Sequence, residues 1–257
     1  MLNYLKSECY RVVHGKELYL MTGILCAVVL AANVVMYAMT FVEDGFPYAT
    51  VRFSLSNLLG MMTMLFALGG LLTALLYSDD RKSGTLKNAI VHGCSRVSIF
   101  TGKCIVSVAA GIVCMAVVMV VYIGSAALLL EGPVAEPVQV ILAAIVAALP
   151  SIAAAVVLAV GIDGFFSKTT TAIVSWIVII FLIPQALALI GLRYEPVAEL
   201  ASWLPTNLFG NEMGVWPMSF SMPWDEPFGW PKCMIVGFTW LLVFGAVGAW
   251  RARRVEV

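Results

Sequence analysis

The sequence predicts an all-α membrane protein with six transmembrane helices, and three observations lead to that fold class. Of the 257 residues, 61% are hydrophobic and only 12% are charged, whereas a soluble domain is about a quarter charged. The mean hydropathy of +0.97 leaves no stretch for a sizeable soluble domain. Six apolar runs reach, or nearly reach, the roughly 20 residues needed to cross a bilayer. We therefore expect residues 1–257 to form a single transmembrane domain.

Residues 1–17 are expected to form an amphipathic helix that lies along the inner membrane surface before the first span. At 100° per residue, the apolar side chains fall within one arc of about 120°, and most polar side chains, Glu8 among them, lie outside it. The apolar face includes Leu2, Leu5, Cys9 and Val12, and the polar face includes Lys6 and Arg11. The alternative is a short juxtamembrane tail with basic anchors.

The six spans are expected at 18–41, 54–77, 104–130, 138–160, 171–192 and 233–250, of which the last is the shortest. None of them contains Asp, Glu, Lys or Arg. Proton relays, ion-coupled carriers and voltage sensors need ionisable groups at membrane depth, so this absence disfavours a secondary transporter. Pro150 and Pro184 lie near the middles of the fourth and fifth spans and should kink them. Each kink is either a hinge or an ordinary feature of a membrane helix.

The side-chain amides of Asn33 and Gln185 lie deep within the predicted spans. A polar group at this depth can line a path for a substrate. It can also form a hydrogen bond that joins neighbouring helices. We favour the second role for Asn33 and leave the first open for both residues.

The segment 78–103 lies between the second and third spans and carries five basic residues. Each would cost about 2.5–3.5 kcal/mol at the bilayer centre, so the segment must lie outside lipid. Thr85 is a good N-cap and Gly93 a good helix stop, which predicts a helix of about two turns between them. Ser95 can cap the helix that follows. Leu86 and Ile90 share one face of that helix. A helix this short is not stable alone and needs a surface to pack on.

The sequence SGTLKNAIVHGCSRVSIFTGK at 83–103 resembles the loop between the second and third spans in the membrane subunits of type-2 ABC exporters. That loop carries an acidic residue, then Gly-Thr-Leu-Lys, Ser-Arg and Gly-Lys. Here the places are filled by Asp79, Asp80, Gly84, Thr85, Leu86, Lys87, Ser95, Arg96, Gly102 and Lys103. The family usually has Glu at the acidic place. The six-span layout and LPTNLF at 204–209 also resemble this family, most closely its small six-span branch.

The resemblance implies that 78–103 contains a coupling helix that docks on a separate P-loop ATPase subunit. Ile90 would join the residues above in this contact. ATP and magnesium would bind to that partner, and this chain would bind no cofactor. Six spans are half of the usual pathway, so a second permease copy or a related permease is implied. The branch often exports antimicrobial peptides, bacteriocins or drugs, which implies an amphipathic or hydrophobic substrate.

The connection at 193–232 holds six of the eleven prolines and four of the seven tryptophans. These tryptophans suit the headgroup layer of the membrane, and they are Trp203, Trp216, Trp224 and Trp230. Residues 195–204 are expected to form a short helix before Pro205. The connection is either an outer lid that contacts a departing substrate or a cap that anchors the fifth and sixth spans.

The distribution of charge predicts that both termini are cytoplasmic and that the protein lies in the cell membrane. Twelve of the fifteen Lys and Arg residues fall in 1–17, 78–103, 161–170 and 251–257. These segments lie on one side if the spans alternate. An excess of Lys and Arg marks the cytoplasmic side.

The sequence contains no catalytic or metal-binding motif. Its two Gly-Lys pairs lack the remainder of a P-loop, and neither H-E-x-x-H nor G-x-S-x-G occurs. The six cysteines show no metal-ligand spacing. We therefore expect no catalytic residues and no metal in this chain, and lipid rather than nucleic acid as a partner. The alternatives to a permease are a membrane enzyme and a non-transporting assembly or sensor subunit.

Overall fold

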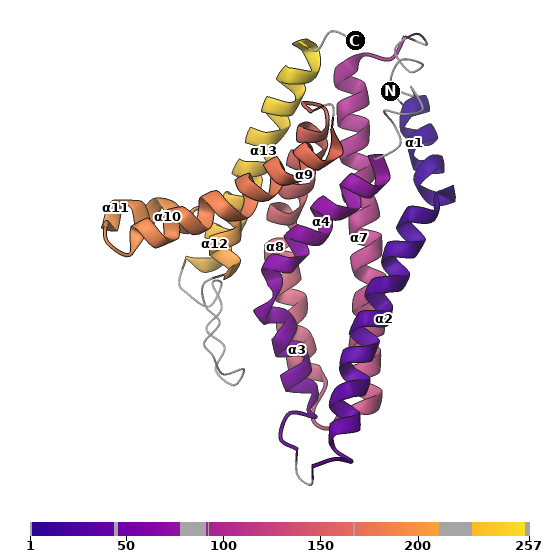
Figure 1. Ribbon diagram of the computed structural model, residues 1–257, viewed down its shortest axis with the longest axis vertical. Coiled ribbons are helices and arrows are strands. Elements are labelled where there is room, and N and C mark those ends of the chain that lie inside the picture. Colours follow the sequence, from indigo (N-terminus) through magenta and orange to yellow (C-terminus); the bar gives the residue numbers. More distant parts are fainter. Residues whose placement is uncertain are drawn as a thin grey trace.

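The computed structural model describes residues 2–43, 46–77, 91, 93–166, 168–210 and 228–254. The helices in chain order are α1 (Leu2–His14), α2 (Lys16–Met39), α3 (Val51–Gly60), α4 (Met62–Tyr77), α7 (Arg96–Leu129), α8 (Ala135–Asp163), α9 (Thr169–Ile177), the π-helix η1 (Val178–Leu182), α10 (Ile183–Gly191), α11 (Glu195–Ser202), α12 (Pro205–Gly210) and α13 (Gly229–Arg254). Most of the long helices run along one elongated bundle (Figure 1). The predicted all-α fold is confirmed.

Five helical stretches are long and apolar enough to cross a membrane, namely α2, α7, α8, the run from α9 through α10, and α13. A sixth crossing results if α3 and α4 count as one span, although they are bent by 62° relative to each other. The predicted second span, 54–77, is therefore broken. The backbone leaves the helix at Met61 (φ −113°, ψ 22°), directly after Gly60. Because the flanking residues are apolar on both sides, hydropathy does not reveal this break.

The start of α1 and the end of α13 lie at one end of the bundle, which we call the terminal end (Figure 1). The start of α7 lies there too, whereas the connections from α2 to α3 and from α7 to α8 lie at the opposite end. There the backbone N–H of Val51 donates to the carbonyl of Glu131 (3.0 Å), and the N–H of Glu131 donates to the carbonyl of Ala49 (3.1 Å). Shared placement of the termini agrees with an even number of crossings.

The helix α8 lies at the centre of the bundle and packs against α3, α4, α7, α9 and α13. Its buried residues include Ala144, Ala147, Ala148, Ala154 and Ala155. Small side chains let membrane helices approach closely. The approach of α13 is tight at Gly237, where an added Cβ would lie 2.6 Å from the Cβ of Pro150. Pro150 thus forms part of the contact surface for α13.

Candidate functional site

A cavity of about 410 Å³, the α4–α9 cavity, lies between α4, the end of α8, and α9 with η1. Its lining is Met64, Ala67, Leu68, Gly70, Leu71, Thr73, Ala74, Ala159, Asp163, Thr169, Ala172, Ile173, Trp176, Ile177 and Phe181. Apolar side chains dominate, and Asp163 and Thr169 lie at one end. Met64 and Leu71 are 57% and 49% exposed, so the cavity is open on one side. Its volume falls in the range of sites for drug-sized ligands, about 300–1,000 Å³.

The inner wall of this cavity depends on one glycine and one tryptophan. The ring of Trp176 lies so close to Gly70 that an added Cβ would be 2.5 Å from Cζ2. The ring is held in place because its Nε1–H donates to the carbonyl of Ala155 (2.9 Å). Because residue 70 is a glycine, the Trp176 ring of α9 can lie directly against α4, and both residues line the cavity.

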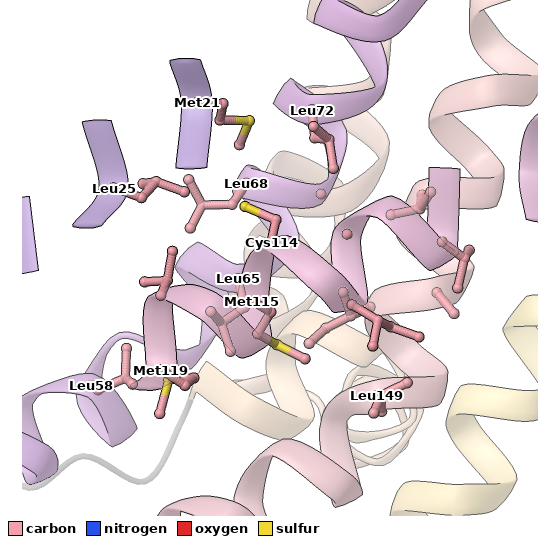
Figure 2. Close-up of a pocket in the computed structure, with 18 of the residues that line it drawn as sticks. Met21, Leu25, Leu58, Leu65, Leu68, Leu72, Cys114, Met115, Met119 and Leu149 are labelled. Carbon is pink, nitrogen blue, oxygen red and sulfur yellow. The ribbon is translucent and has the colours of Figure 1, made fainter. Parts of the chain in front are cut away.

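A second cavity, of about 130 Å³, lies among α2, α3, α4, α7 and α8. Figure 2 shows leucine and methionine side chains converging on it, among them Leu68, Met115 and Met119. Leu68 lines both cavities. This cavity is smaller than the usual site for a drug-sized ligand. The α4–α9 cavity is therefore the stronger candidate for a substrate path.

Helix α4 leads from both cavities to the terminal end, where it ends at Tyr77. The Tyr77 ring is buried between two cations, with the Lys103 ammonium 4.3 Å and the Arg11 guanidinium 5.1 Å from its centroid. The Tyr77 hydroxyl donates to the carbonyl of Lys103 (3.1 Å) and accepts from Ser107 (3.1 Å). Tyr77 thus joins α1, α4 and α7 immediately before residue 78.

The N-terminal helix α1 packs against the first turns of α7 with a face that includes residues predicted to be polar. Glu8 is 8% exposed, accepts from the Tyr4 hydroxyl (2.7 Å) and pairs with Arg11 (2.7 Å). Arg11 also donates to the carbonyl of Leu76 (3.0 Å). Paired in this way, Glu8 and Arg11 turn toward the bundle, although the sequence placed both outside the apolar arc.

The remaining residues of α1 divide between buried and exposed positions. Val12 is buried and Leu5 is half-buried against the bundle, whereas Lys6 and Cys9 are exposed. The side chain of Leu2 lies outside the described residues. Whether α1 lies on the membrane surface stays a prediction.

Three of the expected ATPase-coupling residues lie within the described part of the chain. Ser95 caps α7 by accepting from the N–H of Ser98 (3.1 Å), as predicted. Arg96 starts α7, and Lys103 lies two turns later beside Tyr77. Gly93 has a φ of +81°, which suits the predicted helix stop. The other coupling residues, Asp79, Asp80, Gly84, Thr85, Leu86, Lys87 and Ile90, lie outside the described residues.

Asn33 is fully buried in a polar network that joins α2, α3 and α7. Its Nδ2 donates to the hydroxyl of Ser125 (2.7 Å) and the carbonyl of Tyr122 (3.1 Å), and its Oδ1 accepts from Ser54 (2.6 Å). The Tyr122 hydroxyl donates to the carbonyl of Ser54. These bonds favour the helix-joining role for Asn33. Gln185 is exposed on α10.

The connection at 193–232 begins with the predicted helix, α11, and continues into α12 at Pro205. Trp203 and Trp230 are 39% and 37% exposed. The carbonyl of Trp203 accepts from the Nε1–H of Trp240 on α13 (3.1 Å). Trp216 and Trp224 lie outside the described residues. Within the described part, then, this connection is anchored to the last span.

Sequence reasoning missed the roles of Gly70, Tyr77, Trp176, Thr206 and Asn207. Thr206 and Asn207 belong to the LPTNLF stretch, and both are buried. Their position in the family-like motif could have marked them as candidates. Their spacing in the sequence does not reveal their hydrogen-bond partners on η1 and α10. Among the described residues, no group of three or more His, Cys, Asp or Glu side chains could hold a metal ion.

The comparisons with known proteins agree with this arrangement of helices. No curated protein matches the chain significantly. A family model described as "ABC-2 family transporter protein" matches residues 31–252, which is most of the chain and covers every candidate span after the start of α2. The chain therefore belongs to the ABC-2 transporter family, as a multi-pass membrane permease subunit without ATPase motifs of its own.

Proposed function

We propose that this permease subunit exports an amphipathic or hydrophobic substrate through a path that includes the α4–α9 cavity. The observation that carries the proposal is the chemistry of that cavity, which has apolar walls, a few polar groups at one end and an open side. An apolar path suits a substrate with a large hydrophobic surface. An antimicrobial peptide, a bacteriocin or a drug would fit this description, as the family resemblance implies.

A second permease copy, or a related permease, would complete the path. The open side of the cavity presents Met64, Leu71 and Ile177, which are 57%, 49% and 41% exposed. Membership of the family implies a partner ATPase, and this chain lacks a P-loop. ATP and magnesium would therefore bind to that partner, docked on residues 78–103 at the terminal end. The excess of Lys and Arg in the segments of that end supports a cytoplasmic location for both termini.

Filling the cavity tests the proposed path. The assay is ATP-dependent efflux of ethidium and of a cationic amphipathic peptide in proteoliposomes that contain the permease and its ATPase. Ala67 lines the cavity, so the indole of Ala67→Trp would fill part of it. We expect this variant to lower the efflux of both probes at least about tenfold. The control is Ala32→Trp, which places the same side chain at an exposed position of α2. Equal efflux in both variants would contradict the path, and no efflux of either probe by the unaltered chain would contradict the substrate class.

A further inference from the structure

In the fifth span Pro184 follows the π-helix η1, and α12 bonds to the backbone on both sides of this junction. Proline has no N–H, so the carbonyl of Ile180, four residues earlier, lacks its usual helical donor. The hydroxyl of Thr206 donates to that carbonyl at 2.8 Å. Asn207 Nδ2 donates to the carbonyls of Pro184 (2.9 Å) and Ala201 (3.1 Å). Thr206 and Asn207 are 6% and 5% exposed.

The same short helix also contacts the other wall of the α4–α9 cavity. Phe209 of α12 lies against Phe66 of α4, with ring centroids 6.0 Å apart. Phe66 directly precedes Ala67, and Ile180 directly precedes Phe181, and both Ala67 and Phe181 line the cavity. Helix α12 therefore spans between the two walls at the end of the cavity away from Asp163 and Thr169. We call this end the far end.

We propose that Thr206 and Asn207 are positioning residues of a clasp, formed by α12, that holds the α4 and η1 walls together at the far end of the cavity. The η1 wall cannot move away from α4 without breaking these bonds, which would leave the buried polar groups of Thr206 and Asn207 without these partners. A buried polar group without a partner is costly. Export requires the walls to part at the far end, so the clasp must open once in each transport cycle.

The inference rests on the proposed function only in taking the α4–α9 cavity as the transport path. The bonds themselves are few, which suits a contact that opens and closes. Losing one buried hydrogen bond shifts an equilibrium by roughly fivefold, enough to change the open fraction without unfolding the bundle. This magnitude sets the size of the effect to look for.

The test measures access to the cavity from the side opposite the termini. Ala67→Cys is introduced into a chain whose six native cysteines are replaced by alanine, and an impermeant thiol reagent is applied to intact cells and to inverted vesicles. Thr206→Val keeps the shape of the side chain and removes the hydroxyl, and Thr206→Ser keeps the hydroxyl. We expect Thr206→Val to raise the labelling rate from that side about fivefold and Thr206→Ser to leave it unchanged.

Equal labelling of the Thr206→Val and Thr206→Ser chains would overturn the proposal. A Thr206→Val chain that fails to reach the membrane fraction would overturn it as well, because the bond would then belong to the folded core rather than to a clasp. Labelling requires neither a transported substrate nor the ATPase. The expected labelling together with no efflux of ethidium or the cationic peptide would therefore retain the clasp and reject the export assignment.

Discussion

Tyr77 and Gly70 show how single positions on α4 set its contacts with neighbouring helices. Tyr77 bonds to α7 and contacts cations from α1 and α7 at the end of α4. Gly70 fixes the separation between α4 and α9 because the Trp176 ring occupies the space of a side chain. The two residues join the terminal end to the candidate path.

Gly70→Ala should destabilise the protein. The added Cβ would meet a ring that is hydrogen-bonded in place, and overpacking of this kind costs about 1–3 kcal/mol in the free energy of unfolding. The control is Gly23→Ala on α2, where nothing lies within 4 Å of an added Cβ. Thermal unfolding in detergent should show a lower midpoint for Gly70→Ala alone. Matching midpoints for the two variants would argue against the close contact between α4 and α9.

The bend between α3 and α4 divides one predicted span into two elements with different attachments. Helix α3 is fixed to α2 and α7 through Ser54, Asn33 and Tyr122. Helix α4 packs most extensively against α8 and also contacts α2, α7 and α9. Both halves therefore pack against α7 and α8, and Met61 lies between them.

Asn33→Leu should weaken the attachment of α3. It removes three hydrogen bonds from a buried network, and each such bond contributes about 0.5–1.5 kcal/mol to stability. We expect a lower yield of monodisperse protein in size-exclusion chromatography. Gln185→Leu, at an exposed position, should behave as the unaltered chain. Normal assembly of Asn33→Leu with altered export of ethidium would favour the substrate-path role instead.

The sequence predicted the elements that follow from hydropathy and local capping. The long apolar runs, the Ser95 cap and the helix before Pro205 are local features, and the structure contains each of them. Periodicity gave the sets of residues that share a face of α1, but it did not predict that Glu8 and Arg11 turn toward the bundle, where Arg11 bonds to the carbonyl of Leu76. The contacts of Trp176 and Thr206 join segments more than 20 residues apart. No pattern within one element could have placed them.

At the scale of the whole molecule, the terminal end and the cavity form one connected system. Helices α1, α4 and α7 meet at Tyr77, α4 lines both cavities, and α12 joins α4 to the fifth span. In an ABC-2 transporter, the energy comes from an ATPase that this chain does not contain. The account therefore depends on one contact, in which the segment after Tyr77 docks on that ATPase.

The most direct measurement of this contact is co-purification of the ATPase with the permease, together with ATP turnover in proteoliposomes. Leu86→Asp places a charge on the apolar face of the predicted coupling helix, where one or two anchor residues carry most of the binding energy. Val42→Asp makes a similar change at a 78% exposed position at the opposite end. The account predicts that Leu86→Asp abolishes both co-purification and turnover stimulated by the cationic peptide, while Val42→Asp retains both. Equal co-purification of the two variants with normal stimulated turnover would contradict it.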